Sequence, residues 1–478
     1  MLHLENPEIR SLLLQGKFGL EKEGLRVLAD ASMAHTPHPL NGVSHVSMDF
    51  SENQTEINTS TEPSAEGAVE ALEGYECWLQ RIVSSLPVRE YIWPFSNPPY
   101  LAGEEDIPIA QFTGELASKT AYREYLSGRY GRYKMTFSGI HVNYSFSEEL
   151  LREEFTCRGV GRFRSFRDSF YLELAEKCAA YGWILVILTA ASPIIDASFF
   201  EAGLREKQPS ERKGLPAEKG FSAGKGASAG REPSAERDPS AGKNPGAIGG
   251  RDLFTGMASI RCSELGYWNA FPPVFDYSNI QRYSDSIRSY VNAGLLYAAS
   301  ELYYPVRLKP KGEYSLEGLK EGVDHLELRM FDINPFTRSG LDVRDVQFAQ
   351  LFLIWLASIP RRYLSPLDQV LAVQNFQNAA HYDLRTVKIV MPELRDEAAA
   401  SAEGAALYLL DRMRDFYLGI REDIPDWVPR VLEFERKKIV HPETRYAARA
   451  REQFSGTFLE KGMERAVSLQ EECCCCRK

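Results

Sequence analysis

Alternation of polar and apolar side chains predicts a β-strand at residues 18–27 with an unusual polar face. Glu21 and Glu23 lie two positions apart, so their side chains share one face of a strand, while Lys22 points to the other. Neighbouring carboxylates repel each other unless a cation lies between them, and Mg²⁺ prefers oxygen ligands. The segment is therefore either a metal-binding strand or a solvated sheet edge.

Three further segments, at 47–58, 138–145 and 325–331, repeat this alternation with other polar groups. A turn is expected at 51–53, where Ser, Glu and Asn interrupt the first of them. The polar positions of the three segments are Asp49, Gln54, Glu56, Asn58, His141, Asn143, Ser145, Glu327 and Arg329. A sheet whose polar face carries these side chains is expected to line a site.

Helical periodicity of the apolar residues predicts most of the remaining structure. The expected helices lie at 5–15, 66–86, 163–191, 281–301, 343–359 and within 384–420, with a strand or turn at 302–310. We expect the helices after residue 343 to pack outside the sheet, without chemistry of their own.

The composition is ordinary for a soluble globular protein. The chain has 478 residues, of which 44% are hydrophobic and 26% charged, enough for one large domain with helical additions or for two to three domains. A net charge of -10 argues against a nucleic-acid partner. The longest apolar stretch, 183–191, is too short to span a membrane, and no apolar leader opens the sequence, which predicts a cytoplasmic protein.

A six-residue repeat rich in Ser, Ala, Gly and Pro occupies residues 209–244 and has almost nothing to bury. We predict that 207–244 form a disordered, dispensable loop within a single catalytic domain made of 1–206 and 245–470.

The eight cysteines fall into two groups. Cys77, Cys157, Cys178 and Cys262 are scattered, as expected of reduced core thiols. The other four are consecutive, from Cys473 to Cys476, in a predicted tail at 471–478. Adjacent cysteines pair poorly with one another, and although such thiols can bind soft metals or accept lipid, we expect no catalytic role for them.

The catalytic motifs of several enzyme classes are missing. The chain contains no GxSxG nucleophile elbow, because its two GxSxG matches, at 220–224 and 226–230, both fall within the six-residue repeat. It also contains no P-loop and no GxGxxG, and these absences disfavour serine hydrolases and the common nucleotide folds. Arg and Tyr alternate over 122–133, either as an anion-binding wall or as a helix surface. Carboxylates, one histidine and arginines together suit phosphoryl transfer with Mg²⁺ or Mn²⁺.

Five segments resemble, in the same order, the bacterial glutamate–cysteine ligases. They read GLEKEGLRV at 19–27, MDFSE at 48–52, YRE at 122–124, SGIHVN at 138–143, and LELR with DINPF within 326–336. The resemblance covers the chain except for the repeat and the tail. It implies an α+β, glutamine-synthetase-like fold, in which a curved, mainly antiparallel sheet forms a funnel surrounded by helices.

The resemblance also implies a reaction and a set of roles. With ATP, the γ-carboxylate of glutamate becomes an acyl phosphate that the amine of cysteine attacks. The implied metal ligands are Glu21, Glu23, Asp49, Glu56, His141 and Glu327. Arg329 and Arg123 are implied to stabilise the transferred phosphoryl group, beside Glu327. The implied amino-acid pocket consists of Phe50, Tyr122, Arg261, Tyr267 and Tyr303, with Arg261 on a carboxylate.

Three departures and two alternatives accompany this interpretation. No ATP-grasp domain follows, so the expected product is γ-glutamylcysteine, and the repeat and the consecutive cysteines match no pattern of the family. The alternatives are a ligase that joins glutamate to another amine and a non-catalytic binding protein with the same fold. The sequence does not indicate an oligomeric state.

Overall fold

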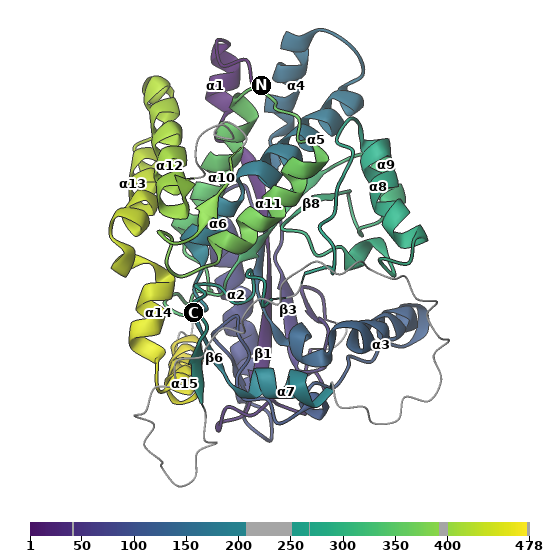
Figure 1. Ribbon diagram of the computed structural model, residues 1–478, viewed down its shortest axis with the longest axis vertical. Helices are drawn as coiled ribbons and strands as arrows, with labels where there is room; N and C mark the ends of the chain where they lie inside the picture. Colours follow the sequence, from purple (N-terminus) through teal and green to yellow (C-terminus); the bar gives the residue numbers. More distant parts are fainter. Residues whose placement is uncertain (41–42, 207–250, 267, 392–399, 476–478) are drawn as a thin grey trace, which may run out of the picture.

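The computed structural model describes residues 1–40, 43–206, 251–266, 268–391 and 400–475 (Figure 1). Its centre is a seven-stranded antiparallel sheet in the order β2-β3-β1-β5-β9-β8, with β4 paired to β1. The strands are β1 (Gly16–Val27), β2 (Val46–Met48), β3 (Gln54–Asn58), β4 (Tyr91–Ile92), β5 (Ile140–Phe146), β8 (Val306–Lys309) and β9 (His325–Phe331). The strands that alternation predicted, β3, β1, β5 and β9, are immediate neighbours.

Two smaller strand pairs and a set of helices complete the architecture. The pairs are β6 (Ile194–Asp196) with β7 (Asp252–Phe254) and β10 (Lys388–Ile389) with β11 (Ala400–Ser401). The helices of four or more turns are α2 (Ala65–Ser84), α5 (Phe163–Tyr181), α10 (Val343–Ser358), α12 (Ala402–Gly419) and α15 (Phe458–Cys475). The shorter ones are α1 (Pro7–Leu12), α3 (Ala117–Tyr130), α4 (Glu148–Arg158), α6 (Trp183–Thr189), α7 (Ser198–Glu206), α8 (Ile280–Asn292), α9 (Leu316–Glu321), α11 (Pro366–Ala379), α13 (Trp427–Val440) and α14 (Tyr446–Phe454).

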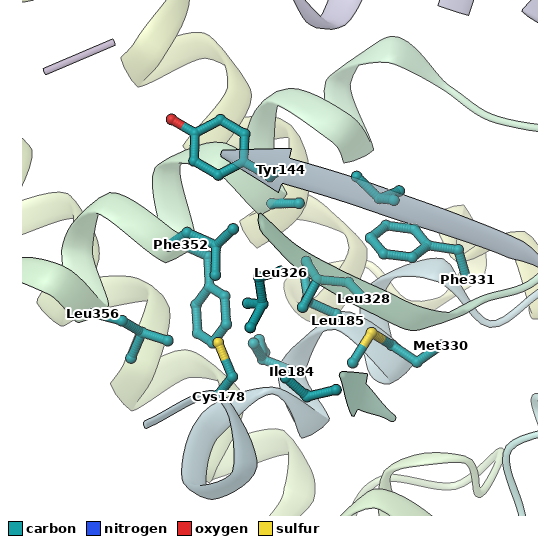
Figure 2. Packing of buried hydrophobic residues seen from close by; sticks show 14 of the residues in the cluster. Tyr144, Cys178, Ile184, Leu185, Leu326, Leu328, Met330, Phe331, Phe352 and Leu356 are labelled. Atoms are coloured by element: carbon teal, nitrogen blue, oxygen red, sulfur yellow. The ribbon is translucent and has the colours of Figure 1, made fainter. Parts of the chain in front are cut away.

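The apolar face of the sheet packs against helices and forms the main core. Leu326 and Leu328 of β9 are fully buried, and Figure 2 shows them beside Ile184 and Leu185 of α6 and Phe352 of α10. Burying one such side chain contributes about 1.5–3 kcal/mol. In Figure 1, α12 and α13 lie to the left of the sheet, and α3, α8 and α9 lie to its right. The α+β fold with a mainly antiparallel sheet is confirmed.

Strand β1 is an interior strand, between β3 and β5, so the solvated-edge alternative is wrong. Lys22, on its apolar side, is 5% exposed and forms an ion pair with Glu76 of α2, with 2.8 Å between Nζ and Oε2. Both charges are buried away from solvent, and each neutralises the other within the ion pair. The other face of β1 is thereby left to its carboxylates.

Several predicted helices differ in their bounds. The helix predicted at 5–15 spans only α1, and the one predicted at 163–191 is divided into α5 and α6. The helix predicted at 281–301 ends at Asn292, because Gly294 adopts φ +71°, a left-handed conformation that glycine tolerates and that turns the chain out of the helix. The region 384–420 is helical only from Ala402, since β10 and β11 precede it. The turn predicted at 51–53 is confirmed: the Ser51 side chain donates to Asn53 between β2 and β3.

The prediction that Cys77 is reduced is wrong, because it forms a disulfide with Cys473. Residues 471–475, predicted as part of a tail, continue α15, whose periodicity turns Cys473 onto its buried face beside Leu469 and toward α2. Of the remaining described cysteines, Cys178 and Cys262 are buried free thiols, and Cys157, Cys474 and Cys475 are exposed ones.

The six-residue repeat lies outside the described residues, so its predicted disorder stays a prediction. Among the helices in the described ranges, none is long and apolar enough to cross a membrane.

Candidate active site

The register of the sheet brings the predicted polar side chains into one continuous face. Glu21 stands opposite His141 on one side, and Glu23 stands opposite Glu56 on the other. Further along, Glu327 pairs with Asn143 of β5 on one side and with Arg307 of β8 on the other. Five strands therefore contribute to the same surface.

His141 lies at the centre of a group of carboxylates. Its Nδ1 is 3.0 Å from Glu21 Oε2 and 3.4 Å from Glu327 Oε1, and its Nε2 is 3.8 Å from Glu23 Oε1. One donor atom each from Glu21, His141 and Glu327 lie within 4.8 Å of one another. Asn143 donates to Glu21 through Nδ2 at 3.0 Å, and its buried Oδ1 has no hydrogen-bond partner in the described part of the chain. These groups fit a divalent cation.

Toward β3 the surface is acidic. Burial, together with the nearby Asp49, Glu21 and Glu23, raises the pKa of Glu56 to about 8. Burial and Asp49 also raise the pKa of Glu23, although His141, Arg261 and Arg329 act against this. Like charges gathered in a buried place disfavour ionisation unless a cation neutralises them. The predicted residues Glu23, Asp49 and Glu56 thus gather negative charge that a divalent cation would neutralise.

Toward β8 the surface is basic. Arg329 Nη1 lies 3.5 Å and Arg307 Nη1 3.7 Å from Glu327 Oε2, and Lys309 Nζ lies 3.6 Å from Glu327 Oε1. Burial acts to raise the pKa of Glu327, but these cations and His141 hold it well below its usual range. The Nε of Arg307 is buried without a hydrogen-bond partner in the described residues. This end of the face is suited to phosphate oxygens.

Arg307 and Lys309 were not among the residues predicted from the sequence. They alternate with Leu308 in a segment bounded by prolines, and this alternation would have placed both side chains on the polar face. Because residues 302–310 were predicted as either a strand or a turn, their alternation was not used to place these side chains.

The strand β9 is irregular at the site. Its register with β5 shifts between Ile140 and Val142, so that Arg329 and Met330 together face His141. Such bulges bend a strand and redirect its side chains. Here the backbone carbonyl of Arg329 accepts a hydrogen bond from Arg261 Nη2 at 2.7 Å. The bulge therefore connects the predicted substrate-binding arginine to the strands that carry the predicted metal ligands.

A cavity of about 60 Å³ lies beside this bulge. Arg261, Arg329 and Tyr303, all predicted from the sequence, line it. Residues that the prediction did not include also contribute, namely Val186, Cys262, Trp268, Tyr304, Pro305, Met330 and Phe376. Two guanidinium groups next to aromatic and sulfur-containing side chains are suited to a small amino acid.

A much larger cavity, of about 1020 Å³, opens on the other side of Glu21. Its wall includes Asn143 of β5 and His325 of β9, together with Lys17, Arg167, Lys311 and Gly312. Glu21 and Asn143 thus face both the metal-binding group and this cavity. Its volume is at the upper end of the roughly 300–1,000 Å³ typical of ligand pockets.

The remaining predicted residues lie around helix α3. Arg123 Nε donates to the backbone carbonyl of Asp49 at 2.5 Å, which places its guanidinium beside the acidic end. Tyr122 hydrogen-bonds Ser300 and is not among the residues lining the small cavity. Phe50 is buried in an apolar cluster with α3 and does not line that cavity either. Tyr267 lies outside the described residues.

Comparison with known proteins identifies relatives over nearly the whole chain. The sequence model of the family described as glutamate-cysteine ligase matches residues 1–219 and 271–379. A glutamate–cysteine ligase of Clostridium acetobutylicum is 33% identical over 74% of this chain and 74% of its own length. The glutathione biosynthesis bifunctional protein of Listeria welshimeri is 33% identical over 98% of this chain. The chain spans 56% of that bifunctional relative.

Two crystal structures share the fold. A bifunctional glutathione synthetase from Pasteurella multocida superposes with a TM-score of 0.75 at 24% identity, covering 98% of this chain and 54% of the other. A glutamate–cysteine ligase from Francisella tularensis, in complex with AMP, gives a TM-score of 0.77 at 20% identity, covering 97% and 90%.

Proposed function

The chain belongs to the glutamate–cysteine ligase family, and on this basis we propose that it joins the γ-carboxylate of glutamate to the amine of cysteine at the expense of ATP. The first half of this reaction transfers the γ-phosphoryl group of ATP to glutamate. The second half replaces that phosphate by the cysteine nitrogen. The product, γ-glutamylcysteine, is a precursor of glutathione, and the cytoplasm stays the predicted location.

The observation that carries the proposal is the position of the carboxylate group between two cavities. Glu21 borders the large cavity, Arg329 borders the small one, and Glu327 lies beside both. A nucleotide fits the large cavity, and the relative of known structure from Francisella tularensis contains AMP. A phosphoryl group that passes from one cavity to the other crosses the ligand set described above.

Mg²⁺ held by Glu21, His141 and Glu327, and by Glu23, Asp49 and Glu56, would neutralise the phosphate oxygens and polarise the transferred group. The protein itself supplies the remaining charge. Arg329 and Arg307 stand beside Glu327 at the basic end, and Arg123 stands beside Asp49 at the acidic end. These fixed guanidinium groups would stabilise negative charge on the phosphoryl group from two directions.

The small cavity would hold an amino-acid substrate. Arg261 is positioned to bind a carboxylate, and its guanidinium is fixed by the backbone carbonyls of Arg329 and Phe331, with Asp332 4.0 Å away. Trp268 and Tyr303 would exclude water around the substrate. Exclusion of water protects an acyl phosphate from hydrolysis, so the amine would be the favoured nucleophile.

A related ligase that joins glutamate to another amine is the second candidate. The small cavity is apolar on the side of Cys262, Met330 and Phe376, and such walls discriminate between small side chains only weakly, by about 1–3 kcal/mol. The third interpretation, a binding protein without activity, is disfavoured because Glu21, Glu327 and Arg329 are all in place.

The test is ADP release with ATP, Mg²⁺ and glutamate, with and without cysteine, and mass spectrometry of the product. We expect cysteine-dependent turnover that Glu327→Gln abolishes. Glu443→Gln, which removes an acid with a 72% exposed side chain, is the matched control and should behave as wild type. Turnover with other amines but not with cysteine would support the activation of glutamate and would change only the assigned acceptor amine. Absence of turnover with every amine would contradict the proposed activity.

A further inference from the structure

Lys309 at the end of β8 places its ammonium group among the carboxylates that are suited to hold metal. Its Nζ lies 3.8 Å from Glu21 Oε1 and 3.6 Å from Glu327 Oε1. We propose that Lys309 is a built-in counter-ion that neutralises these two acids before metal binds, and then moves to the nucleotide phosphates when metal displaces it. The inference rests on the proposed function, since it assigns a role within the same site.

Lys309 would compete directly with a bound metal cation for the same carboxylate oxygens. Glu327 Oε1 is both the atom nearest to Lys309 and an atom 3.4 Å from His141 Nδ1, and Glu21 belongs to the same group of metal-binding donors. An ammonium group and a divalent cation repel each other strongly at such short distance. Occupation by metal therefore requires that Lys309 leave these oxygens.

The surroundings of Lys309 distinguish it from an ordinary structural ion pair. In the buried pair of Lys22 with Glu76, Nζ and Oε2 are 2.8 Å apart, and both side chains are at most 6% exposed. Lys309 instead stands 3.6–3.8 Å from two different acids, and its side chain is 17% exposed. It is held by charge rather than by one fixed hydrogen bond, and a lysine held in this way can change partners.

A second location for the ammonium group lies close by. Lys309 pairs in the sheet with His325, which lines the large cavity, and Lys311 and Glu21 line the same cavity. Four flexible carbons separate the Nζ of Lys309 from its backbone, so the group reaches toward that cavity without movement of β8. The phosphates of a nucleotide bound there would attract it, and Arg307, on the same face of β8, would lie beside them.

The two roles predict opposite effects of removing the charge. Without the competing ammonium group, the nucleotide-free protein should bind metal more tightly. Without the phosphate contact, it should bind nucleotide more weakly. A lysine with a purely structural role would lower both affinities or neither, so the divergence identifies the proposed exchange.

The experiment is titration of the nucleotide-free protein with Mn²⁺, in which free Mn²⁺ is measured by electron paramagnetic resonance. We expect Lys309→Gln to bind Mn²⁺ roughly tenfold more tightly than wild type. Binding of ADP with Mg²⁺, measured by calorimetry without glutamate or cysteine, should become several-fold weaker. Lys309→Arg should retain the wild-type Mn²⁺ affinity within about twofold, because it keeps the charge. Lys388→Gln removes an exposed lysine from β10 and is the control for net charge.

A complementary measurement uses the unaltered protein and does not depend on the folding of a variant. Acetylation of Lys309, followed by mass spectrometry, should become faster when Mn²⁺ releases the ammonium group, and slower again when ADP is added. Unchanged acetylation with Mn²⁺, or unchanged or weaker Mn²⁺ binding by a folded Lys309→Gln protein, would overturn the inference while leaving the proposed function intact. Absence of Mn²⁺ binding to wild type would refute both.

Discussion

Glu23 of β1 and Glu56 of β3 stand directly opposite each other in the antiparallel register of the sheet. Like charges in such positions destabilise a sheet, and both pKa values are raised. A sequence that was optimised for stability alone would not place two acids here. The arrangement is consistent with the proposal that divalent cations neutralise these acids in the working protein.

The first prediction concerns pH. Glu56 has a pKa of about 8 in the folded protein and an ordinary value of 4.5, so between these pH values the folded state binds more protons than the unfolded state. The free energy of unfolding of metal-free protein should therefore fall as pH rises from about 5 to 8, by at most about 1.4 kcal/mol per pH unit for this group. Urea denaturation in EDTA at several pH values measures the slope.

Two comparisons test the origin of that slope. Saturating Mg²⁺ should stabilise the protein most at high pH and flatten the slope, because the metal favours the ionised acids. Glu56→Gln should flatten it without metal, whereas Glu443→Gln, which changes an exposed acid, should not. An equal slope in wild type and Glu56→Gln would exclude Glu56 as its cause.

The second prediction concerns Gly139, which precedes β5. Its backbone N–H donates to Glu23 at 2.9 Å, and a Cβ at this position would overlap the guanidinium of Arg261. Gly139→Ala should displace Arg261 and raise the KM of the amino acid that it binds by about tenfold or more, since a hydrogen bond to a charged group contributes about 1.5–3 kcal/mol. Steady-state kinetics with each substrate varied in turn measure this.

Gly128→Ala provides the matched control, because a Cβ there meets no atom within 4 Å. Its kinetic constants should equal those of wild type. If Gly139→Ala raised the KM values of all three substrates equally, a general distortion of β5 would be the better explanation.

The sequence predicted the central strands well because alternation is a local property. Glu21, His141 and Glu327 were each placed on the polar face of a strand, and neighbouring strands brought those faces together. Lys309 was missed because residues 302–310 were treated as strand or turn without reading their alternation. The relation of Tyr122 to the small cavity depends on how α3 packs, and that packing leaves no local pattern in the sequence.

The pairing of the cysteines could not be predicted from the sequence either. Cys77 and Cys473 are 396 residues apart, and sequence alone does not give disulfide connectivity. The helical periodicity that places Cys473 on the buried face of α15 is present in the sequence, but the run of four cysteines was interpreted as a tail.

The third prediction follows from this disulfide. Cys473→Ala should lower the free energy of unfolding of oxidised protein by about 2–4 kcal/mol, mainly because the unfolded chain is no longer cross-linked. Turnover at 25 °C should be retained, since neither Cys77 nor Cys473 lines a cavity described here. Thermal denaturation with and without dithiothreitol measures the effect. Cys157→Ala changes an exposed free thiol and is the control. Equal stability of Cys473→Ala and wild type without reductant would show that the disulfide is absent in solution.

The fourth prediction concerns the repeat at 209–244. The described chain resumes one helix away from where it stops, because it stops at Glu206, the end of the nine-residue α7, and resumes at Arg251, whose carbonyl accepts from the Ala197 N–H just before α7 at 2.8 Å. A shorter connection can therefore join α7 to β7. Deletion of 209–244 should change the melting temperature by less than about 2 °C and leave turnover unchanged. Loss of turnover in a folded deletion variant would assign the repeat a function.

The fifth prediction concerns the attachment of α3, which carries Arg123 to the acidic end of the site. Leu126 is its only fully buried residue among the side chains described for this helix, and Tyr122, Tyr125 and Tyr130 are only partly buried against the apolar cluster around it, so polar contacts contribute to its attachment. The fully buried Glu301 accepts from the Tyr130 hydroxyl at 2.7 Å and lies 3.3 Å from Arg129 Nε. Charge-assisted contacts of this kind are stronger than neutral ones, and their loss should free the helix.

Glu301→Gln keeps the shape of the side chain and removes its charge. We expect kcat to fall by about tenfold, because Arg123 is positioned through α3, and trypsin cleavage within α3 to become faster. Glu317→Gln is the control, since it removes a 73% exposed acid paired with Arg288 and should change neither quantity. Because no described contact joins Glu301 to the acids predicted to bind metal, Mn²⁺ affinity should be unchanged in both variants. Slower turnover with unaltered proteolysis would mean that the Glu301 carboxylate acts on the substrate pocket through the Tyr130 hydroxyl, Asn269 and Tyr303 instead.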